Sequence, residues 1–274
     1  MKVSIETITP ARAAELLDNN TQNRIISPRA ISRYARAMKS GRWDLNGESI
    51  QIAADGRLLN GQHRLLACIE AGVPFQTVLV TGLTSDVQDT MDTGRSRGPA
   101  GQLQIDGVPN ANATAAVVRQ IYHYLTGETD VDTRQTKEFL AQHGDVRDCI
   151  AAAMQAKKIV PSSVLGAVLW LGSRNKIYWP KINAFCEPLA TGEGLAAGDP
   201  RLSLRNALIN ARIVNKGHAP RQDYVMSLTV HAWNGFVSGR KLSHVKAYMT
   251  RGKRYEMPSV VGGPKPGSGI DEAI

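Results

Sequence analysis

The chain has 274 residues, 42% of them hydrophobic and 21% charged, and its formal net charge is +9 at pH 7. This composition is that of a folded protein and excludes an intrinsically disordered chain. The positive charge favours polyanionic partners such as phosphates and nucleic acids. The three cysteines lie far apart without a CxxC pair, which argues against a zinc site and a disulfide scaffold, and Cys68 is expected in the core.

The sequence shows no signal for secretion or membrane insertion. The N-terminal stretch MKVSIETITPARAAELL has no uninterrupted apolar segment of the kind found in signal peptides. No apolar run approaches the roughly 20 residues that span a bilayer. We therefore expect a cytoplasmic protein with no membrane partner.

The first hundred residues alternate between strand and helix patterns. The stretch VSIETI predicts a strand, and Thr9 and Ser27, each followed by proline, predict the starts of two helices. SIQIA and LL, joined by ADGR, predict a β-hairpin. GQHRLLACIEAG predicts a helix that ends at Gly72, and FQTVLVTGL predicts a further strand. These elements together predict a compact unit with a small mixed sheet.

Helical patterns dominate from residue 101 onward. We predict helices at 110–126, 133–143, 145–157, 161–174, 177–190, 201–214, 220–238 and 241–250. The boundary is expected near residues 98–110, and the Gly- and Pro-rich end is expected to be mobile. The predicted class is α+β: a domain at 1–100 with a small mixed sheet and packed helices, an all-helical domain at 101–258 and a flexible tail at 259–274.

The stretch DGRLLNGQHRLLACIEAG, residues 55–72, places polar residues where a strand becomes a helix. The first N–H groups of a helix lack internal partners and carry partial positive charge, so such a terminus binds phosphate. Gly61 permits close approach of a ligand, Asn60 is a candidate N-cap, and His63 and Arg64 add donors at the same place. In the alternative interpretation Asn60 is a cap, Gln62 and Arg64 are solvated, and His63 is packed. The spacing alone does not decide between the two.

The segment DGRLLNGQHRLLA resembles the signature of the ParB/sulfiredoxin-like superfamily, in the variant known as the DGQHR motif, with Asn60 in place of the usual aspartate. The resemblance extends over residues 20–100 and implies that the strand–helix junction holds nucleotide phosphates. It implies phosphate contacts for Gly61, His63 and Arg64. Gln62 stands where sulfiredoxins carry their nucleophilic cysteine, so sulfinic-acid reduction is excluded. The GQHR sequence also differs from the GERR pattern of ParB, which weakens a chromosome-partition assignment.

Two further segments are candidates for the same site. Glu48 precedes the SIQIA strand, and the kinase branch of the superfamily implies that an acidic residue here acts as a base or helps to hold Mg²⁺; the alternative is a solvated carboxylate. The loop MDTGRSRG contains Asp92, Thr93 and Arg95 around two glycines and resembles a phosphate-facing loop, with a basic linker as the alternative.

Basic residues are also concentrated near the C-terminus, where Tyr248 and Tyr255 are interspersed among them. Such a pattern suits contact with a nucleic-acid backbone and stacking on bases, although a solvated basic face is the alternative. The candidate nucleic-acid residues are Arg240, Lys241, Lys246, Arg251, Lys253 and Arg254.

Two functions therefore remain open. The first is an enzyme that uses ATP or another NTP with Mg²⁺ for phosphoryl transfer or hydrolysis in a nucleic-acid-related pathway, with Glu48, His63 and Arg64 as catalytic residues. Its nucleotide would be bound by Asn60, Gly61, Gln62, His63, Arg64, Asp92, Thr93 and Arg95. The second is a non-catalytic DNA-binding regulator or partition-like protein. Both are compatible with a homodimer, and small basic proteins of this kind occur in phages and mobile elements.

Overall fold

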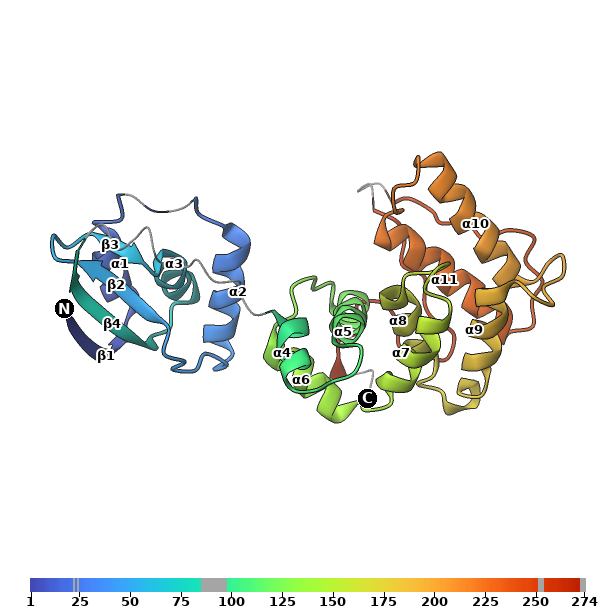
Figure 1. Cartoon of the computed structure of the whole chain (residues 1–274), viewed down its shortest axis with the longest axis horizontal. Coiled ribbons are helices and arrows are strands. Elements are labelled where there is room, and N and C mark those ends of the chain that lie inside the picture. The colour runs from blue at the N-terminus through green and yellow to red at the C-terminus, as the bar shows by residue number, and fades with distance from the viewer. Residues whose placement is uncertain (22, 24, 85–97, 251–253, 272–274) are drawn as a thin grey trace. The chain divides into compact units, whose positions relative to one another are not determined.

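The computed structural model describes residues 1–21, 23, 25–84, 98–250 and 254–271. The chain divides into two compact units, Met1–Arg95 and Ser96–Ile274 (Figure 1). A single four-stranded mixed sheet lies in the first unit, and the regular structure described in the second is helical. The predicted α+β class with a small mixed sheet is thus confirmed. No helix in the described ranges combines the length and the apolarity needed to cross a membrane.

The first unit contains all seven elements that the sequence predicts. Thr9 and Ser27 cap their helices as expected, since their side chains accept hydrogen bonds from the backbone N–H groups of Arg12 and Ala30 at 3.2 and 3.3 Å. The elements are β1 (Lys2–Ile8), α1 (Pro10–Leu17), α2 (Pro28–Lys39), β2 (Ser49–Ala53), β3 (Leu58–Asn60), α3 (Gln62–Ala71) and β4 (Phe75–Leu83).

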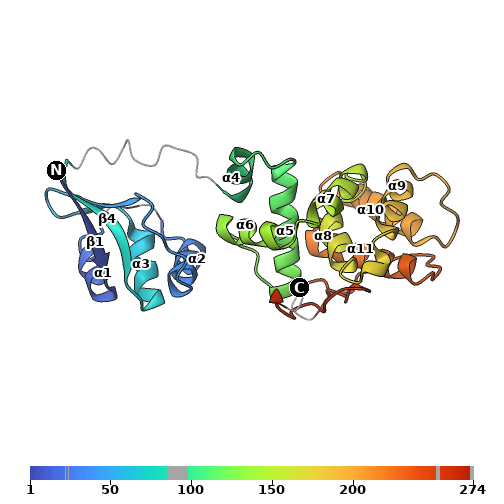
Figure 2. The ribbon, with the colours of Figure 1, turned by 90° about the horizontal axis from the view of Figure 1, so that it is seen from below.

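The sheet has the strand order β1-β4-β2-β3. β1 is antiparallel to β4, β2 is parallel to β4, and β2 and β3 form the predicted hairpin. Alternate residues point to opposite faces, so Val3 and Ile5 of β1 are 58% and 66% exposed while Ile8 is buried. The buried face forms a core with helices α1, α2 and α3, which lie beside the sheet (Figure 2).

The second unit is built around α8, in which Ser163–Gly172 are all buried. This helix packs against α5, α7 and α11, and Trp170 and Trp233 are fully buried in the shared core. The helices are α4 (Pro99–Ile105), α5 (Ala111–Thr126), α6 (Thr133–Gln142), α7 (Val146–Gln155), α8 (Ser162–Gly172), α9 (Lys181–Thr191), α10 (Pro200–Val214) and α11 (Gln222–Val237), with a 3-10 turn at Lys176–Tyr178.

The boundary that the sequence places near residues 98–110 falls between Arg95 and Ser96, and helix α4 follows it. Two expectations about the second unit are wrong. No helix forms within 241–250, where Met249 instead pairs with Tyr255 in an isolated β-bridge. The expected flexible tail is packed over residues 259–271: Val260 is 2% exposed and donates its N–H to Tyr124 Oη at 3.0 Å. Residues 272–274 lie outside the described ranges.

The turn between α6 and α7 is held by a polar cluster. Trp170 Nε1 donates to Asp145 Oδ1 at 3.0 Å, and Arg174 forms an ion pair with the same carboxylate while its guanidinium lies 4.0 Å from the Trp170 ring centroid. Burial acts to raise the pKa of Asp145, but the hydrogen bonds from Arg174 and Trp170 and the charge of Arg174 outweigh it, so the pKa is lowered. The ionised carboxylate is therefore part of the folded structure.

Replacing Asp145 with asparagine should reduce the free energy of unfolding of the second unit at pH 7 by roughly 1 kcal/mol, because the ion pair with Arg174 is lost. The effect is small because this ion pair is partly exposed to solvent. A lowered folded pKa contributes stability above the ordinary aspartate pKa of about 3.9 and loses it as the pH falls through the folded value. The difference between wild type and Asp145→Asn should therefore shrink from pH 7 to pH 3 in urea titrations. Asp148→Asn on the exposed side of α7 is the control, and an equal effect of both changes would contradict the assignment.

Candidate functional site

The polar motif lies at the junction of β3 and α3. Asn60 is the last residue of β3, and Gly61 occupies the N-cap position with φ +110° and no side-chain hydrogen bond to the helix. The prediction that Asn60 caps the helix is therefore wrong. The backbone angle favours glycine here, and a Cβ on Gly61 would lie 2.3 Å from Ile50 Cδ1, so the buried Ile50 side chain would have to move.

The next three side chains are buried rather than solvated. Gln62, His63 and Arg64 are 3%, 8% and 8% exposed. The interpretation in which Gln62 and Arg64 are solvated is wrong, and the packed histidine of that same interpretation is observed. The polar side chains of the motif are thus part of the interior of the first unit, and their contacts define what they can do.

Each of these side chains contacts a different part of the unit. Arg64 Nη2 donates to the Ser49 carbonyl oxygen at 2.8 Å, at the start of β2. His63 Nε2 accepts the backbone N–H of Ser27 at 2.9 Å. Asn20 Nδ2 donates to Gln62 Oε1 at 3.2 Å. The motif therefore joins the beginning of β2 to the segment between α1 and α2.

That segment, residues 19–27, is fastened to the motif by two asparagines. Asn23 Nδ2 donates to both Asn20 Oδ1 and the Leu58 carbonyl oxygen, at 2.7 Å in each case. The Leu58 N–H donates in turn to the Asn19 carbonyl oxygen at 3.2 Å. Sequence reasoning missed these residues, because an asparagine-rich run typically indicates a turn and its partners lie far along the chain.

The hydrogen bond from Ser27 fixes the state of His63. A ring nitrogen that accepts a backbone N–H carries no proton, so the imidazole is neutral and its only N–H is on Nδ1. In this conformation His63 Nε2 is an acceptor and does not donate to a phosphate. The positive charge of the motif comes from Arg64.

Glu48 lies next to the residue that Arg64 contacts. Its side chain is exposed, while its carbonyl oxygen accepts a hydrogen bond from Thr77 Oγ1 at 3.0 Å, which ties the start of β2 to β4. No group of three or more metal-ligating side chains occurs among the described residues. A single exposed carboxylate suits Mg²⁺ that is held mainly by substrate phosphates and water, and does not suit an all-protein metal cage.

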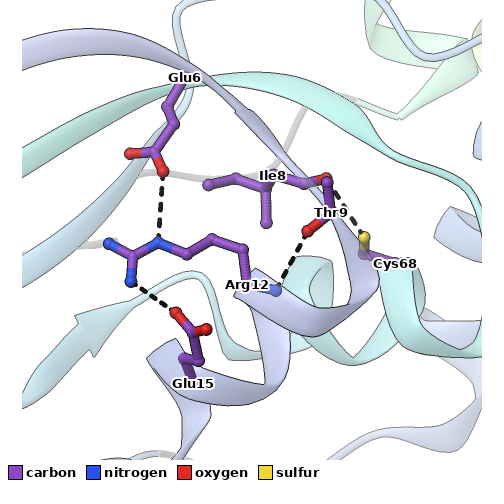
Figure 3. A network of polar contacts seen from close by, with 6 residues as sticks. All are labelled: Glu6, Ile8, Thr9, Arg12, Glu15 and Cys68. Atoms are coloured by element: carbon purple, nitrogen blue, oxygen red, sulfur yellow. Dashed lines mark hydrogen bonds and ion pairs between the residues drawn. The ribbon is translucent and has the colours of Figure 1, made fainter.

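Helix α3 is anchored to β1 by Cys68 (Figure 3). The thiol lies 3.6 Å from the Ile8 carbonyl oxygen and 3.3 Å from that of Val73, either of which can accept its hydrogen, and burial raises the pKa of Cys68, so the side chain is a protonated core residue as predicted. Beside it, Arg12 forms ion pairs with Glu6 and Glu15 at 3.3 and 2.8 Å. Arg12 is thus engaged by two carboxylates and is not a candidate phosphate ligand.

Several predicted site residues lie outside the described ranges, namely Asp92, Thr93, Arg95, Arg251 and Lys253. The other candidate nucleic-acid residues belong to the second unit and are all exposed: Arg240, Lys241, Lys246 and Arg254. Comparison with known proteins found no matching family model, no matching curated protein and no matching solved structure.

Proposed function

We propose that the first unit is a ParB/sulfiredoxin-like domain that binds the phosphates of ATP or another NTP, with Mg²⁺, at the β3–α3 junction. The observation that carries the proposal is that the N-terminus of α3, which begins after Gly61, carries the buried guanidinium of Arg64 within its first turn. Backbone N–H groups and a helix dipole favour an anion at such a terminus. A buried guanidinium adds a charge whose interactions are less screened than at the surface.

The proposed roles follow from the contacts. The phosphates lie against the backbone N–H groups at the start of α3, and Arg64 stabilises the charge of the transferring phosphoryl group. Glu48 acts as a base or as an oxygen ligand of Mg²⁺, which neutralises phosphate charge when bound. Asn60 lines the junction as the last residue of β3.

The segment 19–27 is the part that we expect to respond to the ligand. Gln62 and His63 are covered and hydrogen-bonded to Asn20 and Ser27, so a ligand that touches these side chains must displace this segment or bind beside it. Ligand binding and the position of the segment are therefore coupled, because the same side chains serve both.

The test is a thermal-shift screen of the full chain against ATP, GTP, CTP and UTP, with and without Mg²⁺, followed by calorimetry on the nucleotide that stabilises it. Arg64→Lys keeps the charge but loses the planar fork, and is expected to weaken nucleotide binding about tenfold, equivalent to about 1.4 kcal/mol. Arg147→Lys, at an exposed position of α7, should have no effect. Glu48→Gln should abolish Mg²⁺-dependent phosphate release while nucleotide still binds.

The proposal fails if no nucleotide shifts the melting temperature, or if Arg64→Lys and Arg147→Lys bind nucleotide equally well. Binding without phosphate release would leave nucleotide recognition in place and favour the second candidate, a DNA-binding regulator. That candidate is supported by the exposed basic side chains of the second unit together with the net charge of +9.

A further inference from the structure

The second unit contains an open hollow of about 530 Å³ between the C-terminal half of α10, the start of α11 and Tyr255. Its apolar wall comes from Ala207, Ala211 and Val214 of α10. Hollows of about 300–1,000 Å³ are the size that holds small ligands. None of the residues of the predicted nucleotide site lines it, so it is a separate feature of the chain.

Two tyrosine rings form the opposite side of the hollow. The rings of Tyr224 and Tyr255 lie 4.9 Å apart between centroids at 58°. Asp223 holds both in place, since its carboxylate accepts the backbone N–H of Tyr224 at 3.0 Å and that of Tyr255 at 3.2 Å. Burial raises the pKa of Tyr224, and so does the neighbouring Tyr255, which keeps its hydroxyl protonated. The aromatic surface is therefore positioned before any ligand arrives.

The polar groups of the hollow are amides. The exposed residues Asn210 of α10 and Asn215, which caps the end of that helix, line it, and neither side chain forms a hydrogen bond with another described residue. An amide presents a donor and an acceptor side by side, which matches the edge of a nucleobase.

A cationic side chain lies at the edge of the hollow. The guanidinium of Arg221 lies 5.5 Å from the Tyr255 ring centroid and pairs with Asp223 at 2.6 Å, so these two charges offset each other. Lys216 follows Asn215 in the chain and is exposed, as is Arg254 before Tyr255. Aromatic rings bordered by cations are typical of sites for single-stranded nucleic acids.

We propose that this hollow binds one nucleotide unit, with the base stacked against Tyr224 and Tyr255, its edge hydrogen-bonded by Asn210 or Asn215, and its phosphate beside Arg221. The source of this unit is either a single-stranded nucleic acid or a free nucleotide. The inference goes beyond the proposed function of the first unit and does not depend on it.

The test measures fluorescence anisotropy of the full chain with a labelled single strand of about 12 nucleotides, within the range that single-strand-binding folds occupy. The matching duplex is measured beside it, and unlabelled AMP and TMP serve as competitors. Tyr255→Ala should weaken binding of the single strand by about 5- to 150-fold, because one stacked base is lost, whereas Tyr255→Phe should retain binding. Tyr248→Ala is the control, since Tyr248 is 58% exposed in the same basic segment and does not line the hollow.

A second pair of variants tests the site without changing its two tyrosines. Asn210→Asp should weaken binding clearly more than Asn206→Asp, which introduces the same charge at an exposed position one turn earlier on α10. Competition by AMP or TMP that Tyr255→Ala removes identifies a free nucleotide as the ligand, and binding of the strand alone identifies a nucleic acid.

If Tyr255→Ala and Tyr248→Ala weaken binding equally, or if Asn210→Asp and Asn206→Asp do, the binding is diffuse and electrostatic and the proposal is overturned. Equal affinity for duplex and single strand would overturn it in the same way. The absence of binding to every probe would overturn it as well. Arg64→Lys is expected to leave the affinity for these probes unchanged. A loss of binding in Tyr255→Ala therefore tests the hollow, and a loss of nucleotide binding in Arg64→Lys tests the site in the first unit.

Discussion

Gly61→Ala should destabilise the first unit by about 3 kcal/mol, because two independent penalties add at one position. The φ of +110° lies in a region that costs a residue with a side chain about 1–3 kcal/mol. The new Cβ would also lie 2.3 Å from Ile50 Cδ1, and overpacking of this kind costs about 1–3 kcal/mol. The change should be measured as the urea dependence of hydrogen exchange in peptides covering α3.

The two penalties can be separated. Ile50→Val deletes the Cδ1 atom that the new methyl group meets. The double variant Gly61→Ala/Ile50→Val should therefore lose less unfolding free energy than the two single variants lose together. Gly72→Ala is the matched control, because its φ is +68° and no atom lies within 4 Å of the added Cβ, so about 1–2 kcal/mol is expected. If Gly61→Ala and Gly72→Ala have the same effect, the contact with Ile50 has no energetic consequence.

Gly263→Ala is expected to release the C-terminal segment of the second unit and to reduce stability by roughly 2–3 kcal/mol. A Cβ at this position would lie 2.3 Å from the Leu171 carbonyl oxygen at the end of α8, and backbone cannot yield as a flexible side chain does. Displacement of the segment would also break the two hydrogen bonds of Asn234, to the Ser259 carbonyl oxygen and from the Val261 N–H, both 2.8 Å long. Thermal melts and hydrogen exchange in peptides covering 259–271 measure the effect.

Gly144→Ala serves as the control for that change, since an added Cβ there meets nothing within 4 Å and the residue has no positive φ. Hydrogen exchange should remain slow at 259–271 in this variant and become fast in Gly263→Ala. Slow exchange in both variants would mean that the segment is held by other contacts and that the close approach to α8 is dispensable.

Local signals account for the parts of the fold that the sequence predicts. Thr9 and Ser27 are followed by proline and cap their helices, and Gly72 ends α3 in the left-handed conformation. Alternation predicts β1, although its Val3 and Ile5 are exposed, and the β-branched and apolar residues of FQTVLVTGL predict β4. Each of these features depends on a few neighbouring residues, which a single sequence displays.

The environment of the motif depends instead on partners that are distant in the chain. Gln62 and His63 are buried because Asn20 and Ser27 reach them across 42 and 36 positions, and no periodic pattern marks such pairs. The C-terminal segment is similar, since glycines that suggest mobility also allow close approach to α8, and Tyr124 supplies the hydrogen bonds. The phosphate site of the first unit, with its Mg²⁺ and NTP, stays a prediction.

The position of β1 in the sheet has a consequence for biosynthesis. Lys2–Ile8 are synthesised well before Phe75–Leu83, the strand with which they pair in the described sheet. At translation rates of roughly 5–20 residues per second, the nascent chain spends seconds with Val3 and Ile5 on an incomplete edge before β4 emerges. In a chain truncated before β4, the strand β1 lacks the partner with which it forms backbone hydrogen bonds. Such a chain should be bound by chaperones instead of accumulating as a folded fragment.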